Sequence, residues 1–351
     1  MRVASCGCEP LGLHWRLLIG IILLGTTPHG LLAKDDQPQG LPPHVEHVLR
    51  WLPEDTETLI VARSVILPVL VPDRTYTWQD VGTWLAFGEW DLVGGGKLSK
   101  PLQGRKMACV IHGAKNFESV SSFGSLRSES CSIIVFEADL GDAAREWTEG
   151  LRKEAKAVRT LVGREVFVFP STTEMEPWVK ETMWQGTYFV LLNPNTLLCA
   201  SSDRFLESLL RRIDDVPGAR ALPGDLPEWK YVDFDAPVWM LRHLPKVGRR
   251  IHTVGATATF QRDGFRVVYV PKIGSDQNLE WIKGNWEDCL PKQGPDDQKS
   301  RDRLRIGRPS DGTVVVSCGG RLNPEDPLPE QFGLCLRLYW LQGQALIAPD
   351  K

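Results

Sequence analysis

Short β-rich runs of apolar residues, bounded by Gly, Ser or Pro, are the most regular pattern along this chain. They predict strands at TLIVARS (58–64), KMACVIHG (106–113), CSIIVFEA (131–138) and REVFVFP (164–170). Two further pairs of runs flank turn residues, at Asn193-Pro194-Asn195 within 187–201 and at Asp263-Gly264 within 256–270. Turn residues placed between apolar runs predict β-hairpins.

Other segments carry apolar residues at helical spacing. In the clearest case, residues 141–158, the apolar residues step by four along one face. Ser202 or Asp203 can cap a second helix that starts next to them. This second helix covers residues 203–213, and two further helices are predicted at residues 44–52 and 276–290.

The predicted strands follow one another as hairpins or neighbours, with helices inserted irregularly. A doubly wound parallel sheet needs regular alternation of strand and helix, which this sequence lacks. We therefore expect an α+β fold with antiparallel sheets built from hairpins and helices packed on one face. A linker rich in Pro and Gly, residues 216–228, is expected to end an N-terminal α+β domain of residues 34–215. Residues 229–351 then form either a C-terminal α+β domain or a continuation of the same domain.

The N-terminal segment has the layout of a secretory signal peptide. Arg2 and Arg16 precede the apolar run 17–24, and Ala33 is a small residue suited to cleavage. The run is shorter than the roughly 20 apolar residues that span a bilayer. We expect removal of residues 1–33 and export to the periplasm or the extracellular space, with no membrane span afterwards. A retained N-terminal anchor is the alternative.

The amino-acid composition limits the kinds of binding partner that we expect. The net charge is −3 and the two signs are interspersed, so no concentrated basic surface is expected and a nucleic-acid partner is not predicted. Thirteen tryptophans are many for 351 residues. Their dispersal along strand-like and helix-like runs favours core packing, although stacking on sugars, as in a lectin-like domain, is an alternative.

Six cysteines remain after cleavage, and an even number in an exported chain allows disulfides. Cys318 and Cys335 are the best candidate pair, because each lies in a predicted strand and a loop connects the two. The alternative is that all six are buried thiols packed as small hydrophobic groups. No C-x-x-C spacing occurs, so a thioredoxin-like or zinc-ribbon site is not expected.

Two segments, LPEDTETLIVARS (52–64) and DAPVWMLRHLP (235–245), resemble uncharacterised exported proteins of planctomycete-type bacteria. The resemblance covers under a tenth of the chain. It implies export and an α+β fold, and it implies no activity.

Familiar catalytic signatures are missing. The segment GGGK (94–97) is not a phosphate-binding loop, because Leu98 follows the lysine and Asp91 stands where the first glycine is required. There is no Gly-x-Ser-x-Gly and no Ser-x-x-Lys. We predict no catalytic residue, no metal and no cofactor.

One polar group stands out, formed by Asp233, Asp235, Arg242 and His243. Two carboxylates, an arginine and a histidine within eleven positions could line a cleft. They could equally form a structural ion-pair network, and the sequence favours the network. The sequence as a whole predicts an exported, non-catalytic binding or structural protein of the periplasm or cell envelope, with an unknown protein or glycan partner. A secreted hydrolase acting on polysaccharide or peptide is the alternative.

Overall fold

The computed structural model describes ten stretches of the chain. They are residues 41–66, 100–119, 126–169, 187–215, 219–243, 253–261, 264–271, 283, 304–309 and 311–319. All ten stretches belong to one compact unit of the chain. The predicted signal peptide, residues 1–33, therefore lies outside the described residues, as does most of the predicted helix 276–290.

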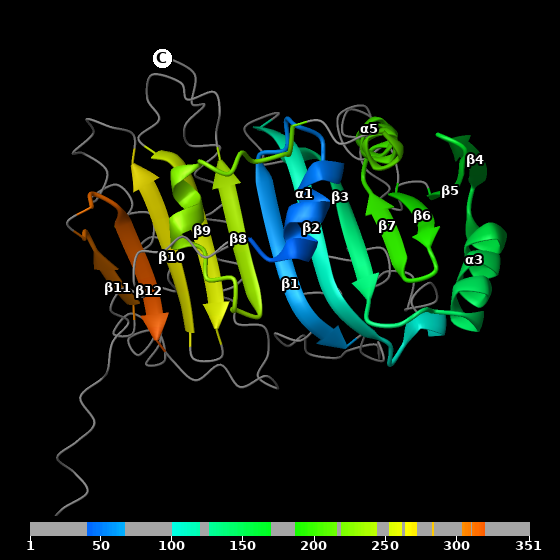
Figure 1. Ribbon diagram of the computed structural model, residues 1–351, viewed down its shortest axis with the longest axis horizontal. Helices are drawn as coiled ribbons and strands as arrows, with labels where there is room; N and C mark the ends of the chain where they lie inside the picture. The colour runs from blue at the N-terminus through cyan, green and yellow to red at the C-terminus, as the bar shows by residue number, and fades with distance from the viewer. Residues whose placement is uncertain are drawn as a thin grey trace, which may run out of the picture. The chain divides into compact units, whose positions relative to one another are not determined.

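The described residues contain twelve strands, all in one antiparallel sheet (Figure 1). In chain order the strands are β1 (Thr58–Ile66), β2 (Lys106–Ser119), β3 (Leu126–Phe136), β4 (Ala157–Leu161), β5 (Arg164–Phe169), β6 (Thr187–Asn193), β7 (Thr196–Ala200), β8 (Val238–His243), β9 (Thr253–Gln261), β10 (Gly264–Pro271), β11 (Leu304–Gly307) and β12 (Val314–Gly319). Across the sheet their order is β11-β12-β10-β9-β8-β1-β2-β3-β7-β6-β5-β4.

Both predicted hairpins are present. β6 pairs with β7 around Pro194, and β9 pairs with β10 with Gln261 opposite Gly264. A third hairpin, β4–β5, was not predicted. Its two-residue turn, Val162-Gly163, has positive φ at both positions, as the favoured two-residue hairpin turns require.

The sheet continues across the predicted linker, because β1 pairs with β8. The pairing sets Ile60 opposite Met240, with Thr58 opposite Arg242 at one end. The segments before and after residues 216–228 therefore share one sheet. Where any domain boundary falls stays a prediction.

Three α-helices accompany the sheet in the described residues: α1 (Pro43–Trp51), α3 (Asp142–Glu154) and α5 (Asp203–Asp214), with short 3₁₀ helices η2 (Lys100–Leu102) and η3 (Pro227–Tyr231). Ser202 caps α5 by accepting a hydrogen bond from the Phe205 amide, which confirms one of the two predicted caps. The predicted helix 141–158 ends at Glu154, because Ala155 turns to an extended conformation that leads into β4.

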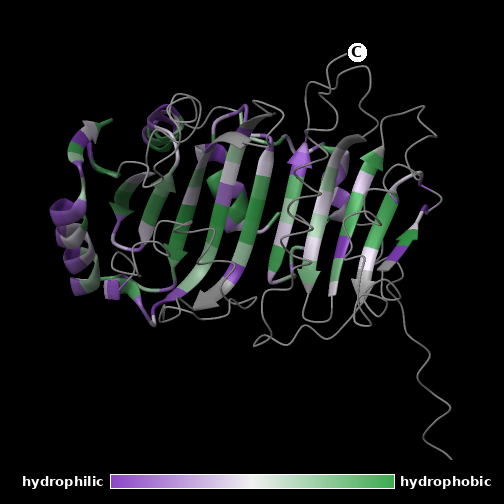
Figure 2. Ribbon diagram, turned by 180° about the vertical axis from the view of Figure 1, so that it is seen from behind, coloured by the Kyte–Doolittle hydropathy of each residue, from purple (hydrophilic) through white to green (hydrophobic). Residues whose placement is uncertain are grey.

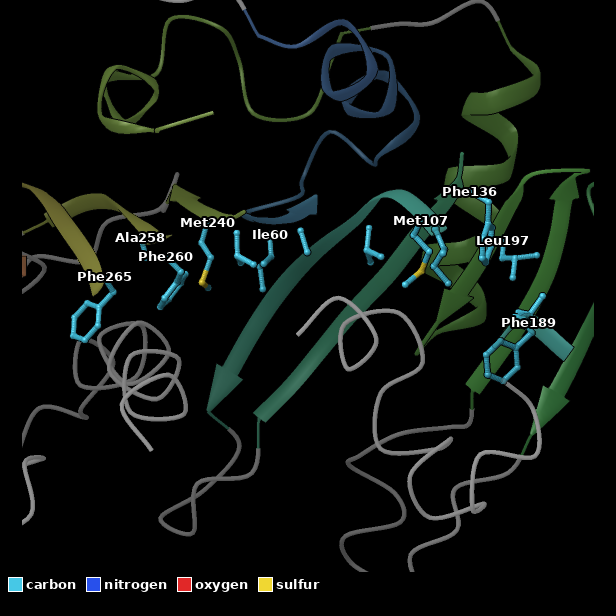
Figure 3. Close-up of a cluster of buried hydrophobic side chains, with 14 of the residues drawn as sticks. Ile60, Met107, Phe136, Phe189, Leu197, Met240, Ala258, Phe260 and Phe265 are labelled. Carbon is cyan, nitrogen blue, oxygen red and sulfur yellow. The ribbon is translucent and has the colours of Figure 1, made fainter. Parts of the chain in front are cut away.

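Alternating side chains give the sheet two buried faces, as strand geometry requires. On β1, Ile60 joins one apolar cluster and Leu59 the other, and we name the two faces after these residues. Figure 3 shows part of the Ile60-face cluster, which includes Met240 and Phe260. In Figure 2, hydrophobic residues recur along the strands of the sheet, whereas hydrophilic residues dominate α3.

The helices divide between the two faces. The buried residues of α1 and α5 belong to the Leu59-face cluster, whereas those of α3, among them Trp147, belong to the Ile60-face cluster. A sheet-dominated α+β fold is therefore present. The prediction that the helices pack on one face is not confirmed, because α3 packs with the opposite cluster from α1 and α5.

Candidate functional site

The four polar residues singled out in the sequence lie in two places, the loop before β8 and the last two positions of that strand. Arg242 and His243 are consecutive in this strand, so their side chains leave it on opposite faces. Arg242 shares the Ile60 face with Met240, and His243 shares the Leu59 face with Leu241. The structure therefore does not place these two side chains in one cluster.

Asp233 and Asp235 lie in the loop that leads into β8. Asp233 accepts a hydrogen bond from the Asp235 amide through Oδ1 at 3.1 Å. Asp235 lies 3.9 Å from Nη1 of Arg63, and this guanidinium also donates to the Phe234 carbonyl at 2.5 Å. Arg63 and Arg242 lie at opposite ends of the β1–β8 pair, because Thr58, not Arg63, stands opposite Arg242.

A buried glutamate that the sequence reasoning missed is the main partner of His243. Nδ1 of His243 lies 2.9 Å from Oε1 of Glu228, whose side chain is fully buried, while the imidazole is partly exposed. Glu228 belongs to η3, which Trp229 fastens to the Leu59 face. The indole of Trp229 donates to the Pro223 carbonyl at 2.8 Å and its ring contacts Trp239 edge-on.

Gly255 on β9 makes room for this pair. It stands opposite His243 in the strand register. A Cβ at this position would overlap the Glu228 carboxylate and the Arg242 carbonyl. The missing side chain of Gly255 thus leaves the space in which the carboxylate lies.

The Glu228–His243 pair has the geometry of a carboxylate that orients an imidazole. With Nδ1–H donated to Oε1, the ring's other nitrogen, Nε2, is left as a base or a ligand. Within the described contacts, Oε2 of Glu228 has no hydrogen-bond partner. No group of three or more His, Cys, Asp or Glu side chains that could hold a metal ion occurs among the residues that the structure describes.

The other end of η3 carries a second polar group. The Tyr231 hydroxyl donates to Oδ2 of Asp311 at 2.9 Å, and Oδ1 of Asp311 accepts from the amide and hydroxyl of Thr313. Burial raises the pKa of Asp311, but the hydrogen bonds from Thr313 and Tyr231 outweigh it, so the net pKa is lowered. Burial lowers the pKa of the nearby Arg266 guanidinium, and the charges of Asp311 and Asp233 partly oppose that shift.

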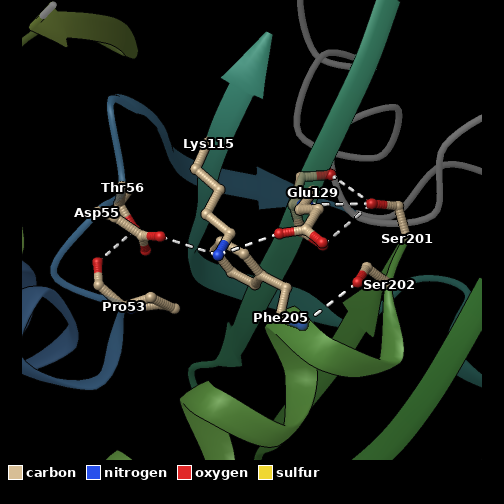
Figure 4. A network of polar contacts seen from close by, with 9 residues as sticks. Pro53, Asp55, Thr56, Lys115, Glu129, Ser201, Ser202 and Phe205 are labelled. Carbon is tan, nitrogen blue, oxygen red and sulfur yellow. Dashed lines mark hydrogen bonds and ion pairs between the residues drawn. The ribbon is translucent and has the colours of Figure 1, made fainter. Parts of the chain in front are cut away.

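A third polar group fastens α5 and the chain before β1 to the Leu59 face (Figure 4). Nζ of Lys115 lies 2.9 Å from Asp55 and 3.1 Å from Glu129, and it stands over the Phe205 ring. Burial lowers the pKa of Lys115, but hydrogen bonds to both carboxylates outweigh burial and the net pKa is raised. The lysine is therefore held as a cation between β3, the loop before β1 and α5.

The remaining described ionisable groups with shifted pKa values are held in uncharged forms. Nδ1 of His112 lies 2.8 Å from the Ser132 hydroxyl, and burial lowers the His112 pKa to about 4. Burial raises the pKa of the Cys109 thiol to about 11 and that of Cys131 well above its ordinary value. These groups suit packing, since a thiolate is the form that attacks substrates.

The predicted disulfide lies partly outside the described residues. Cys318 belongs to β12, whereas Cys335 is not among the described residues. Cys109, Cys131 and Cys199 are not joined in disulfides. The pairing of Cys318 with Cys335 stays a prediction.

Four of the thirteen tryptophans are described, and they favour the core-packing interpretation. Trp147, Trp229 and Trp239 are buried, and Trp51 is partly exposed with its ring against His47. A lectin-like site needs exposed coplanar rings, which these four do not supply.

No protein-family model, curated protein or solved structure matches this chain. None of the helices in the described stretches is both long and apolar enough to cross a membrane.

Proposed function

We propose that this chain is exported and acts as a non-catalytic binding or structural protein of the periplasm or cell envelope, with a protein or glycan partner. The observation that carries the proposal is that ion pairs fasten helices and loops to the sheet and to one another. Lys115 joins Asp55 and Glu129, and Arg220 pairs with Glu46 of α1. Ion-pair networks of this kind stabilise a fold without taking part in catalysis.

The pKa values of the thiols and of the partly buried His112 imidazole also support a non-catalytic role. A cysteine nucleophile needs a lowered pKa, whereas the pKa values of Cys109 and Cys131 are raised. A histidine general base works best with a pKa near the working pH, whereas that of His112 is about 4.

Export is supported by the charged and apolar layout of residues 1–33. The test is expression of the full chain with a C-terminal tag, followed by cell fractionation and N-terminal sequencing. We expect a mature N-terminus at Lys34 outside the cytoplasm. The Ala33→Arg variant should remain unprocessed, whereas the control Lys34→Ala should be cleaved normally. An intact Met1 in the cytoplasm would overturn the export proposal.

A secreted hydrolase acting on polysaccharide or peptide is the second candidate, and the Glu228–His243 pair favours it. A buried carboxylate that orients an imidazole is a recurring arrangement in hydrolases, where the imidazole acts as general base. Glu228 supplies the orienting carboxylate at 2.9 Å, and His243 remains partly exposed.

One assay separates the two candidates. The purified mature chain is incubated with a panel of polysaccharides and an unstructured protein, and released reducing ends and amines are measured. The binding or structural role predicts no turnover above a buffer blank. Turnover that is lost in His243→Ala and reduced in Glu228→Gln, but retained in the exposed control His47→Ala, would establish the hydrolase instead.

A further inference from the structure

β4 forms one of the two edges of the described sheet, and β11 forms the other. β4 is the last strand in the sheet order, so among the described strands only β5 pairs with it. Its three central residues, Val158, Arg159 and Thr160, are all exposed. Val158 is also the one large apolar side chain that is exposed among the described residues.

The hairpin turn decides which backbone groups of β4 face outward. In a two-residue hairpin the pair that flanks the turn is hydrogen-bonded, which here is Leu161 with Arg164. The alternation then directs the amides and carbonyls of Arg159 and Leu161 toward β5. Those of Val158 and Thr160 point to the outer edge. Each offers one donor and one acceptor to an added strand.

The side chains around this edge are mostly basic. Lys153, Lys156 and Arg159 are exposed along the end of α3 and β4, with Glu154 as the acidic exception. Two nearby arginines already have acidic partners: Arg152 pairs with Glu165 and Arg164 pairs with Asp214. The edge therefore carries a net positive charge.

We propose that β4 is a docking edge for an extended acidic segment of a partner protein, which adds to the sheet as a thirteenth strand. Main-chain hydrogen bonds to Val158 and Thr160 would give affinity. An acidic side chain opposite Arg159 and an apolar one beside Val158 would give selectivity. The inference deepens the proposed binding role and rests on it.

Charge argues against a second copy of this chain as the occupant. If two β4 strands paired antiparallel and used all four outward backbone groups, Arg159 would stand directly opposite its own counterpart. Like charges in directly opposite positions of a strand pair are destabilising. Charged residues on edge strands commonly prevent self-association in this way.

The test uses the mature chain and a labelled eight-residue peptide of alternating Val and Glu, followed by fluorescence anisotropy. A Val–Lys peptide of the same length is the charge control. We expect saturable binding of the Val–Glu peptide, at least tenfold tighter than the Val–Lys peptide. Raised salt should weaken it.

Two variants locate the contact. Thr160→Pro removes an outward amide that β5 does not use, and proline is tolerated on such edges, so the fold should persist by circular dichroism. This variant should bind at least tenfold more weakly, whereas Thr160→Ala should bind normally. Arg159→Glu should reverse the preference between the two peptides.

Unchanged binding by Thr160→Pro, or equal binding of the two peptides, would overturn the inference. So would sedimentation as a dimer that Thr160→Pro converts to a monomer, because the edge would then belong to a second copy. Export is measured separately by the N-terminus of the secreted chain, so failure here is distinguishable from failure of the proposed function.

Discussion

Glu228 and Gly255 together determine the surroundings of His243. Glu228 contacts the imidazole, and Gly255 leaves the space that the carboxylate occupies. Neither stood out in the sequence, because a glutamate next to Pro227 and a glycine between Val254 and Ala256 are ordinary residues in ordinary contexts. Their roles arise when η3 crosses the Leu59 face and brings the carboxylate against β9. No local pattern carries that information.

Gly255→Ala should destabilise the protein by about 2–4 kcal/mol, because the new methyl group meets the Arg242 carbonyl as well as the Glu228 carboxylate. Urea unfolding of the mature chain measures this change. Gly150→Ala is the matched control. A Cβ at this position in α3 meets nothing within 4 Å, so the free energy of unfolding should rise by up to about 1 kcal/mol. A stability equal to wild type in Gly255→Ala would show that the carboxylate does not need this space.

His112 should make the fold sensitive to acid. Its pKa is about 4 in the folded chain against 6.5 in the unfolded chain, so the unfolded chain binds the proton more readily. The stability that the depressed His112 pKa contributes is fully present above pH 6.5. It falls as the pH drops from about 6.5 to about 4, and it does not change further below pH 4. The loss over that window is about 3 kcal/mol. Urea midpoints measured from pH 7 to pH 4 check this.

His112→Asn is the control for the acid effect. Its amide oxygen can accept from the Ser132 hydroxyl without titrating, so this variant should lose the part of the pH dependence that His112 causes. If the variant and the wild type show the same slope between pH 6.5 and pH 4, the His112 imidazole is not responsible.

Among the elements, α5 shows how far a local pattern can be trusted. Its apolar positions and its Ser202 cap follow from spacing and side-chain chemistry, and both are present. The helix 141–158 was predicted too long, because Lys156 to Val158 are compatible with a helix in isolation. Pairing with β5 favours the extended conformation there, and that pairing is tertiary.

Lys115 and Glu129 should be energetically coupled, because this ion pair joins two strands and the lysine is nearly buried. A double-mutant cycle with Lys115→Met and Glu129→Gln should give a coupling free energy of about 1–3 kcal/mol from urea unfolding. The exposed pair Arg145–Asp142 on α3 is the control, and its cycle should give less than about 0.5 kcal/mol. Equal coupling in both pairs would contradict a fastening role for Lys115.

Among the described strands, the two halves of the sheet begin with the same order of strands when followed outward from the centre. Outward from the centre they run β1-β2-β3-β7 on one side and β8-β9-β10-β12 on the other, in both cases three consecutive strands followed by a later one. The halves meet at the β1–β8 pair, whose residues Ile60 and Met240 lie in the same apolar cluster.

The two halves should therefore unfold together. In urea, tryptophan fluorescence and the circular dichroism of the strands should follow one transition with the same midpoint, because separating β1 from β8 exposes both buried faces. Two resolved transitions would instead support separate domains of residues 34–215 and 229–351.

Local chemistry accounts for the parts of this protein whose partners are close in sequence: the β6–β7 and β9–β10 hairpins, the start of α5 and the strand character of β1 to β3. In each, turn residues, caps or alternating side chains act over a few positions. The order of the strands, the split of the helices between two faces and the meeting of Glu228 with His243 required the assembled sheet. They depend on contacts between distant segments, and many orders of similar apolar strands satisfy the same alternation. Burial of both faces at once selects among those orders, and it is a property of the folded chain as a whole.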